Sequence, residues 1–280
     1  MGFQQRLWNR THIVGIAAML VVSLFGLSGC GAAGATNDGP VFAMPTDPPA
    51  GDGSLPTADE VLESMVAFMA SQQHLAVDAH VTYEVLQDSG QLLTFDTVQY
   101  LDLRRPDRLA WTTVRDDATV DEVWLADGVF TMLKHPDNIY GQVEDLPTEI
   151  TEAVDVLVDG YAIFVPFSDL ISGHASQIFL EKSDSKVYVG ESWIRGQWTH
   201  HLALQGEDFD VELWVDADGD PLPLRMGIRW KHEQGQPAYF ARFHNWNLRP
   251  DFDDTTFRAD IPEGVEHAVM VPVVDYLGGE

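Results

Sequence analysis

Residues 77–85 read VDAHVTYEV, and this stretch determines the kind of fold that the chain adopts. Every odd position holds an apolar or aromatic residue, and every even position holds a polar one. Successive side chains of a β-strand point to opposite faces, so the alternation predicts a strand with one buried face. The turn residues Asp88-Ser89-Gly90 follow. Residues 92–103 then give a second strand, which starts an antiparallel sheet.

The same kind of segment recurs along most of the chain. Turns such as Asp127-Gly128 and Asp218-Gly219-Asp220 separate the segments. The further predicted strands are 109–115, 120–126, 129–134, 139–143, 186–189, 198–205, 211–216, 222–231 and 238–248. Antiparallel strands at this spacing close into a barrel or curl over a helix, which predicts a mainly β (α+β) protein.

Two helical segments interrupt the strand pattern. Thr57 and Glu60 form the sequence signature of a capping box, and apolar residues recur at helical spacing over 58–73. Residues 148–158 lack glycine and proline and place their apolar side chains on one side, which predicts a second helix. Residues 164–171 are apolar and irregular, which is consistent with a short helix.

The N-terminal 30 residues resemble the export signal of a bacterial lipoprotein. A short basic segment precedes an apolar run over residues 13–27, and residues 27–30 read LSGC. This order predicts cleavage after Gly29 and lipidation of Cys30, the only cysteine. The alternative is a transmembrane anchor, but an apolar run of about 15 residues is shorter than the roughly 20 that span a bilayer.

These signals divide the chain into four parts. Residues 1–29 are the predicted signal peptide, 30–56 the lipidated cysteine and a flexible tether, 57–265 the folded domain, and 266–280 a C-terminal tail. The domain is then held to a membrane of the cell envelope through the lipid on Cys30 and faces the periplasm. The residues after Cys30 lack an aspartate that retains lipoproteins in the inner membrane, which favours the outer membrane.

The charge of the chain restricts its partners. It carries 44 acidic and 16 basic residues, and its formal net charge is −28. Nucleic acid is excluded as a partner, because binding phosphates requires a basic surface. Direct docking on anionic head groups is disfavoured for the same reason. The pattern leaves the oligomeric state open.

Several blocks of the C-terminal half occur together in one known family. They are GEDFD at 206–210, LWV at 213–215, PLPLR at 221–225 and ARFHNWNL at 241–248, with RPDRL at 105–109 and YVG at 188–190 upstream. In this order the blocks resemble the predicted periplasmic proteins of domain of unknown function 2092, which look like members of the LolA/LolB-like clan. The resemblance implies an incomplete antiparallel barrel of about 10–11 strands wrapped over helices, with an apolar cavity that holds acyl chains.

The chemical motifs in the sequence are weak. We find no catalytic serine, zinc-protease, P-loop or dinucleotide motif, and we predict no enzyme activity, no cofactor and no metal. His200 and His201 are adjacent on a strand and point to opposite faces, which favours a packed His200 over a metal site. The segment 216–220 resembles a calcium loop but has Gly227 where the loop needs a glutamate. Arg104, Arg105 and Arg108 either grip an anionic ligand or, as we favour, pair with nearby carboxylates.

The leading functional hypothesis is a binding protein for an acyl chain, a lipid or a lipoprotein. The insertion 148–171 is the predicted lid, with Gly160, Pro166 and Gly173 as hinges. Five residues are predicted to contact the ligand, namely Phe164, Phe167, Leu170, Ile171 and Trp246.

Two alternatives remain open at this stage. In the first, side chains fill the barrel, and the protein is an interaction or sensor protein of the envelope. In the second, which is weaker, it is an envelope hydrolase. A lumen of several hundred Å³ would favour a ligand over a filled barrel.

Overall fold

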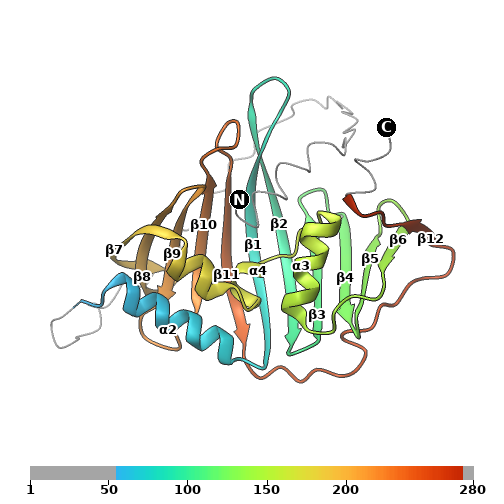
Figure 1. Cartoon of the computed structure of the whole chain (residues 1–280), viewed down its shortest axis with the longest axis horizontal. Helices are drawn as coiled ribbons and strands as arrows, with labels where there is room; N and C mark the ends of the chain where they lie inside the picture. Colours follow the sequence, from blue (N-terminus) through green and yellow to red (C-terminus); the bar gives the residue numbers. More distant parts are fainter. Residues whose placement is uncertain (1–54, 274–280) are drawn as a thin grey trace, which may run out of the picture.

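The computed structural model describes residues 55–273, which form one sheet of 12 strands with four short helical segments (Figure 1). The strand order is β12-β6-β5-β4-β3-β2-β1-β11-β10-β9-β8-β7. The strands are β1 (His74–Leu86), β2 (Leu92–Arg104), β3 (Arg108–Arg115), β4 (Val120–Ala126), β5 (Val129–Lys134), β6 (Ile139–Val143), β7 (Ser183–Ile194), β8 (Gln197–Gly206), β9 (Phe209–Asp216), β10 (Pro223–Trp230), β11 (Ala238–Asn247) and β12 (Glu266–Val269). All pairs are antiparallel except β12 with β6.

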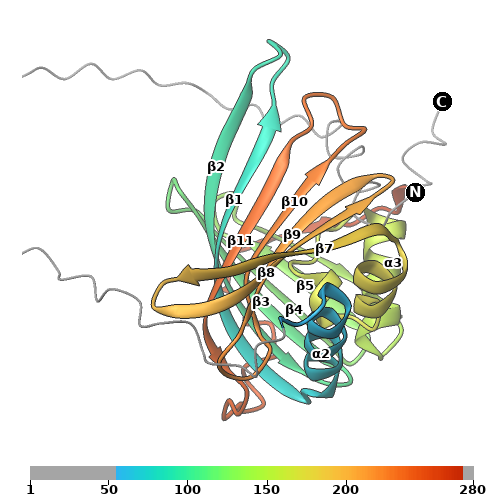
Figure 2. The same cartoon turned by 90° about the vertical axis from the view of Figure 1, so that its left-hand side faces the viewer.

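The helical segments are α2 (Ala58–Ser71), α3 (Ile150–Tyr161), α4 (Ser168–Ile171) and a π-helical turn, η1 (Gln177–Glu181). Figure 2 shows α2 and α3 on the same side of the curled sheet, and we call this side the inner face. The sheet is open, so the predicted incomplete barrel wrapped over helices is confirmed. No helix among residues 55–273 is long and apolar enough to cross a membrane.

Helix α2 begins where the capping box predicted it. The Glu60 amide donates to Thr57 Oγ1 at 3.2 Å, and the Thr57 amide donates to Glu60 Oε2 at 2.8 Å. These two bonds satisfy backbone donors that the first turn leaves without helical partners. The buried side of α2 consists of Ala58, Val61, Leu62, Met65, Val66 and Met69.

The inner face is apolar at the end of the sheet where β1 begins and β2 ends, and this part forms the main core. Leu101 on β2 faces Val77 on β1 and Trp111 on β3, and Trp111 in turn faces Val123 on β4. All four are buried, and they pack in one cluster with the buried sides of α2 and α3. We call this part of the face the covered zone; its further members are Leu75, Leu103, Leu109, Leu125 and Phe130.

The structure has one strand more than the largest predicted number. Strand β12 lies in the segment 266–280 that the sequence indicated as a tail, and it pairs in parallel with β6. It has only four residues, none of them buried, so no alternation of apolar and polar residues marks it. Met270 follows and packs against the core beside Gly141, where a Cβ atom would lie 2.8 Å from Met270 Cγ.

A bulge near the end of β11 changes which side chains share a face. Between the pairs Asp78–His244 and Ala76–Asn247 the register shifts, and Asn245 has a left-handed φ of 55°. A bulge inserts one extra residue into a strand and reverses the alternation beyond it. Trp246 therefore packs with Phe243 against the core, although strict alternation from Phe240 placed the two on opposite faces.

Candidate functional site

The segment between α3 and α4, together with α4, lies over the inner face of β10 and β11. We call residues 162–171 the lid segment. Its two bends fall on Ala162, with φ 55°, and Phe167, with φ 56°, and not on the predicted glycine hinges Gly160 and Gly173. A left-handed backbone costs a non-glycine residue roughly 1–2 kcal/mol, so the lid segment is strained at an aromatic side chain.

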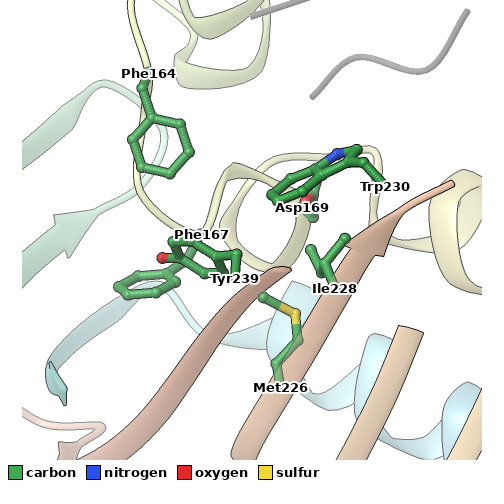
Figure 3. A pocket seen from close by; sticks show the side chains of 7 residues that line it. All are labelled: Phe164, Phe167, Asp169, Met226, Ile228, Trp230 and Tyr239. Atoms are coloured by element: carbon green, nitrogen blue, oxygen red, sulfur yellow. The ribbon is translucent and has the colours of Figure 1, made fainter. Parts of the chain in front are cut away.

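A small pocket separates the lid segment from the sheet (Figure 3). Its lining residues are Phe164, Phe167 and Asp169 from the lid segment, Met226, Ile228 and Trp230 from β10, and Tyr239 from β11. The cavity volume, measured for the centre of a water-sized sphere, is about 10 Å³. That volume corresponds to roughly one water molecule, so in this conformation side chains fill the space under the lid segment.

Two predicted contact residues, Phe164 and Phe167, line this pocket. The Phe167 ring lies edge-on to Phe243 at a centroid distance of 4.8 Å and is only 3% exposed. The Phe164 ring lies 6.1 Å from the Tyr239 ring and is 39% exposed. Phe167 therefore holds the lid segment to the sheet, while Phe164 lies at the outer side of the pocket.

The other three predicted contact residues lie elsewhere. Leu170 and Ile171 are buried in the core cluster and do not line the pocket. Trp246 donates its indole N–H to the carbonyl of Pro223 at 3.1 Å, beyond the bulge of β11. The sequence analysis did not predict the pocket residues that come from the sheet, which are Met226, Ile228, Trp230 and Tyr239. The apolar and aromatic residues of β10 and β11 were the available signal, but alternation alone does not show which strand lies under the lid segment.

Three side chains in the otherwise apolar wall carry hydrogen-bonding groups, namely Tyr239, Asp169 and Trp230. The hydroxyl of Tyr239 is buried and has no hydrogen-bond partner among residues 55–273. Burial raises the pKa of Tyr239 above its ordinary value, and the Asp169 carboxylate raises this pKa further. Tyr239 therefore stays neutral and can donate a hydrogen bond to a ligand that enters the pocket.

Arg105 anchors the end of the lid segment. Its Nη2 donates to the carbonyl of Ile171 at 2.6 Å, and its Nε donates to the carbonyl of Gln72 just after α2. Burial lowers the pKa of Arg105, although an arginine remains charged in proteins. The neighbouring Arg108 forms a two-bond ion pair with Asp127, at 2.7 Å for each bond. Arg105 therefore binds backbone carbonyls where the sequence suggested a carboxylate partner or an anion.

The inner face becomes more polar next to the covered zone, toward the hairpin that joins β1 and β2. Gln99 on β2 faces Thr113 on β3, which faces Asp121 on β4. Arg115 forms an ion pair with Asp121 there. We call this more polar part of the inner face the open zone, although its side chains are half-buried (Tyr83, Thr113, Arg115) or buried (Thr97, Gln99, Asp121).

The two adjacent histidines and the calcium-like segment, neither of which the sequence favoured as a metal site, contact other protein groups. His200 Nδ1 lies 3.0 Å from the Tyr188 hydroxyl, and burial lowers the pKa of His200. His201 contacts Glu212 on the other face and stacks on Trp214. Asp216 Oδ1 accepts backbone hydrogen bonds at the turn between β9 and β10. Within residues 55–273, no group of three or more His, Cys, Asp or Glu side chains is arranged to hold a metal ion.

A family model matches residues 58–271, which includes the lid segment and every strand of the sheet. Its description is predicted periplasmic protein (DUF2092). The chain belongs to this family. Membership in DUF2092 confirms the resemblance that the sequence blocks indicated. No curated protein matches the chain in sequence.

The DUF2092 chain is also similar to solved structures at low sequence identity. It covers 99% of a LolA superfamily protein from Nitrosomonas europaea with 74% of its own length, at 13% identity and a TM-score of 0.36. The match to the lipoprotein LppX from Mycobacterium tuberculosis covers 98% of LppX and 70% of this chain, at 12% identity and a TM-score of 0.44. The match to LprF from Mycobacterium bovis covers 97% of LprF and 74% of this chain, at 13% identity and a TM-score of 0.42.

Proposed function

We propose that this protein is a non-enzymatic binding protein of the periplasm that takes an acyl chain, a lipid or a lipoprotein between the lid segment and the sheet. The single observation behind the proposal is the pocket under the lid segment. The lid side presents two phenylalanine rings with Asp169 beside them, and the sheet side is aliphatic and aromatic, with the neutral Tyr239 phenol and the Trp230 indole N–H as its hydrogen-bonding groups. Affinity would come from burial of alkyl surface, at about 25 cal/mol per Å².

An acyl chain enters the pocket only if the lid segment moves, because the space under the segment now holds about one water molecule. Two features support such a movement. Phe167 is strained in the left-handed region, so its release recovers free energy. Helix α4 has only four residues and no side-chain hydrogen bond at its N-cap. Arg105 and the Phe167–Phe243 contact oppose the opening.

Titration with a dansyl-labelled fatty acid tests the proposal. The chain carries Cys30→Ser in this experiment, so that no covalent lipid competes with the probe. We expect saturable binding at one site. Phe164→Asp should weaken that binding at least tenfold, because it places a carboxylate at the apolar mouth and disfavours an alkyl chain there.

Val156→Asp is the matched control. Val156 lies on α3, is 38% exposed, and is outside the pocket lining, so its substitution introduces the same charge at the same exposure. Binding by this control should equal that of the parent chain. Absence of binding by the folded parent chain, or equal loss in both variants, would refute a ligand site under the lid segment.

A second candidate function is an interaction or sensor protein whose interior is filled by its own side chains. The small volume of the pocket favours it, because it is far below the several hundred Å³ expected of a preformed ligand cavity. In that case the folded protein binds no fatty acid and no lipid co-purifies with it. Lipid extraction followed by mass spectrometry distinguishes the two functions.

We also propose that the lipid anchor on Cys30 holds the protein at the membrane, with outer-membrane placement favoured. Cys30 lies outside the described residues, so the support is the LSGC sequence and the family of predicted periplasmic proteins. Cys30→Ser should prevent lipidation and signal cleavage after Gly29 and should remove the protein from the outer-membrane fraction. Identical processing and membrane association of the variant would contradict lipidation.

A further inference from the structure

The open zone holds three buried polar atoms that have no hydrogen-bond partner among residues 55–273. They are Thr97 Oγ1, Gln99 Oε1 and Asp121 Oδ1. The exposed fractions of these residues are 7%, 5% and 7%. A buried polar atom without a partner costs about 1–3 kcal/mol, and most such atoms in folded proteins are paired. Three such atoms on one face of β2 and β4, the two strands that flank β3, therefore indicate a surface that pairs with something outside the fold.

These atoms lie on one continuous wall with the pocket under the lid segment. Tyr239 of the pocket faces Tyr83 across the β1–β11 pair, and the Tyr83 ring stacks on Phe95 of β2 at 5.7 Å. Thr97 follows Phe95 by two residues on the same face of β2, which places the two residues about 7 Å apart along the strand. A chain seated under the lid segment that follows these aromatic rings thus reaches the open zone with its other end.

The chemistry of the open zone selects the kind of head group. Gln99 Oε1 and Asp121 Oδ1 accept hydrogen bonds, and the Thr97 hydroxyl both donates and accepts. Two cations belong to this part of the sheet: Arg115 is already paired with Asp121, and Lys134, which faces Asp121 across the β4–β5 pair, is paired with Asp137. Asp116 and Asp117 add negative charge close by, since both raise the pKa of Tyr83. An anionic head group finds no free cation in this zone, whereas hydroxyl groups find acceptors.

We propose that Thr97, Gln99 and Asp121 form a head-group subsite that selects an acyl lipid with an uncharged, hydroxyl-bearing head, such as an acylglycerol, over a fatty acid. This inference rests on the proposed function, because the acyl chain of the same ligand occupies the space under the lid segment. Ligand hydroxyls would supply the hydrogen bonds that the three buried atoms lack within the described fold.

The test compares two displacing ligands with the same alkyl chain, monopalmitoylglycerol and palmitate. Each displaces the dansyl-labelled fatty acid from the Cys30→Ser chain. We expect monopalmitoylglycerol to bind at least tenfold more tightly, which is the effect of one to two net hydrogen bonds. Gln99→Leu and Thr97→Val should each reduce this ratio severalfold and leave palmitate binding unchanged. Thr94→Val, on the opposite face of the same strand, should leave the ratio intact.

A second measurement needs no ligand. If Thr97 and Gln99 lack partners in the free protein, replacing them with valine and leucine removes a cost, and the melting temperature should stay equal or rise. A fall of several degrees would show that both side chains serve the fold, and it would overturn the subsite. Equal affinity for the two lipids would also overturn it and leave the lid site intact. Absence of binding by either lipid would refute the proposed function and the subsite together.

Discussion

The covered zone and the open zone belong to the same strands and the same face of the sheet, yet they differ in chemistry. Leu101 on β2 is buried against Val77 and Trp111, whereas Gln99, one step along the same face, is buried with an oxygen that has no partner within residues 55–273. Helices α2 and α3 pack on the first zone and complete a hydrophobic core. The difference teaches that burial alone does not identify a hydrophobic core. A buried side chain stabilises the fold when it packs against apolar neighbours, and it lowers stability when its polar atoms find no hydrogen-bond partner.

The largest effect that we predict is in the covered zone. Leu101→Ala removes a fully packed side chain and should lower the free energy of unfolding by about 2–5 kcal/mol. Urea denaturation measures the change, with Gln99→Leu as the comparison in the open zone. The two zones would not differ as described if Gln99→Leu destabilised the protein as much as Leu101→Ala.

The next effect concerns the anchor of the lid segment. Arg105→Ala leaves the carbonyls of Ile171 and Gln72 without their donor and should cost about 1–3 kcal/mol. Hydrogen exchange should speed up in residues 162–171 more than in α3. Arg104→Ala is the control, because Arg104 lies 3.9 Å from an exposed carboxylate, that of Asp254. Unchanged exchange in the lid segment would show that Arg105 does not hold it.

A smaller effect is expected at the start of α2, the helix that packs on the covered zone. Thr57→Ala removes the cap and should cost about 1 kcal/mol. Thermal unfolding followed by circular dichroism measures it. Ser64→Ala, at an exposed position within α2, should not lower the melting temperature. Equal melting temperatures for Thr57→Ala and the parent chain would mean that the capping box adds nothing to the fold.

The smallest effect lies on the outer face of β2. Burial raises the pKa of Asp102, and the carboxylate of Asp78 raises it further. The folded protein therefore binds this proton more tightly than the unfolded chain, so ionised Asp102 lowers stability above its folded pKa. Asp102→Asn should add less than about 1 kcal/mol at pH 7. The gain should disappear as the pH falls to about 4, the ordinary value for aspartate. A gain that persists at pH 3 would exclude this electrostatic cause.

Local sequence patterns were sufficient to predict most of the fold. The alternation in VDAHVTYEV, the capping box at Thr57 and the turn residues each act over a few neighbours, and the structure has a strand, a helix start and hairpins at those places. Strand β12 was missed because its partner is β6, far away in sequence, and its own four residues carry no period. Alternation along 238–248 would place Trp246 on the same face as Phe240, but the bulge at Asn245 reverses the alternation without a clear mark in the sequence.

The site was predictable only on its lid side. Phe164 and Phe167 stand out as aromatic residues in an irregular apolar segment, and both line the pocket. The sheet side depends on which strand the lid segment covers, and that is a tertiary property. The open zone was equally hidden, since Gln99 and Asp121 look like ordinary polar residues until the register places them on the inner face beside Leu101 and Val123.

The pairing of β1 with β11 has a consequence for the order of folding. Strands β1 to β6 form one meander and β7 to β11 another, and the two meanders are adjacent only where β1 pairs with β11. A side-chain hydrogen bond across this pair joins Asp78 and Asn245, which are 167 positions apart in the sequence. Contacts of such long range slow folding, because the loop that they close costs entropy before it gains contacts. We therefore expect the first meander to keep an unpaired edge until the second docks on it, and this step to set how long the folding chain is exposed to aggregation.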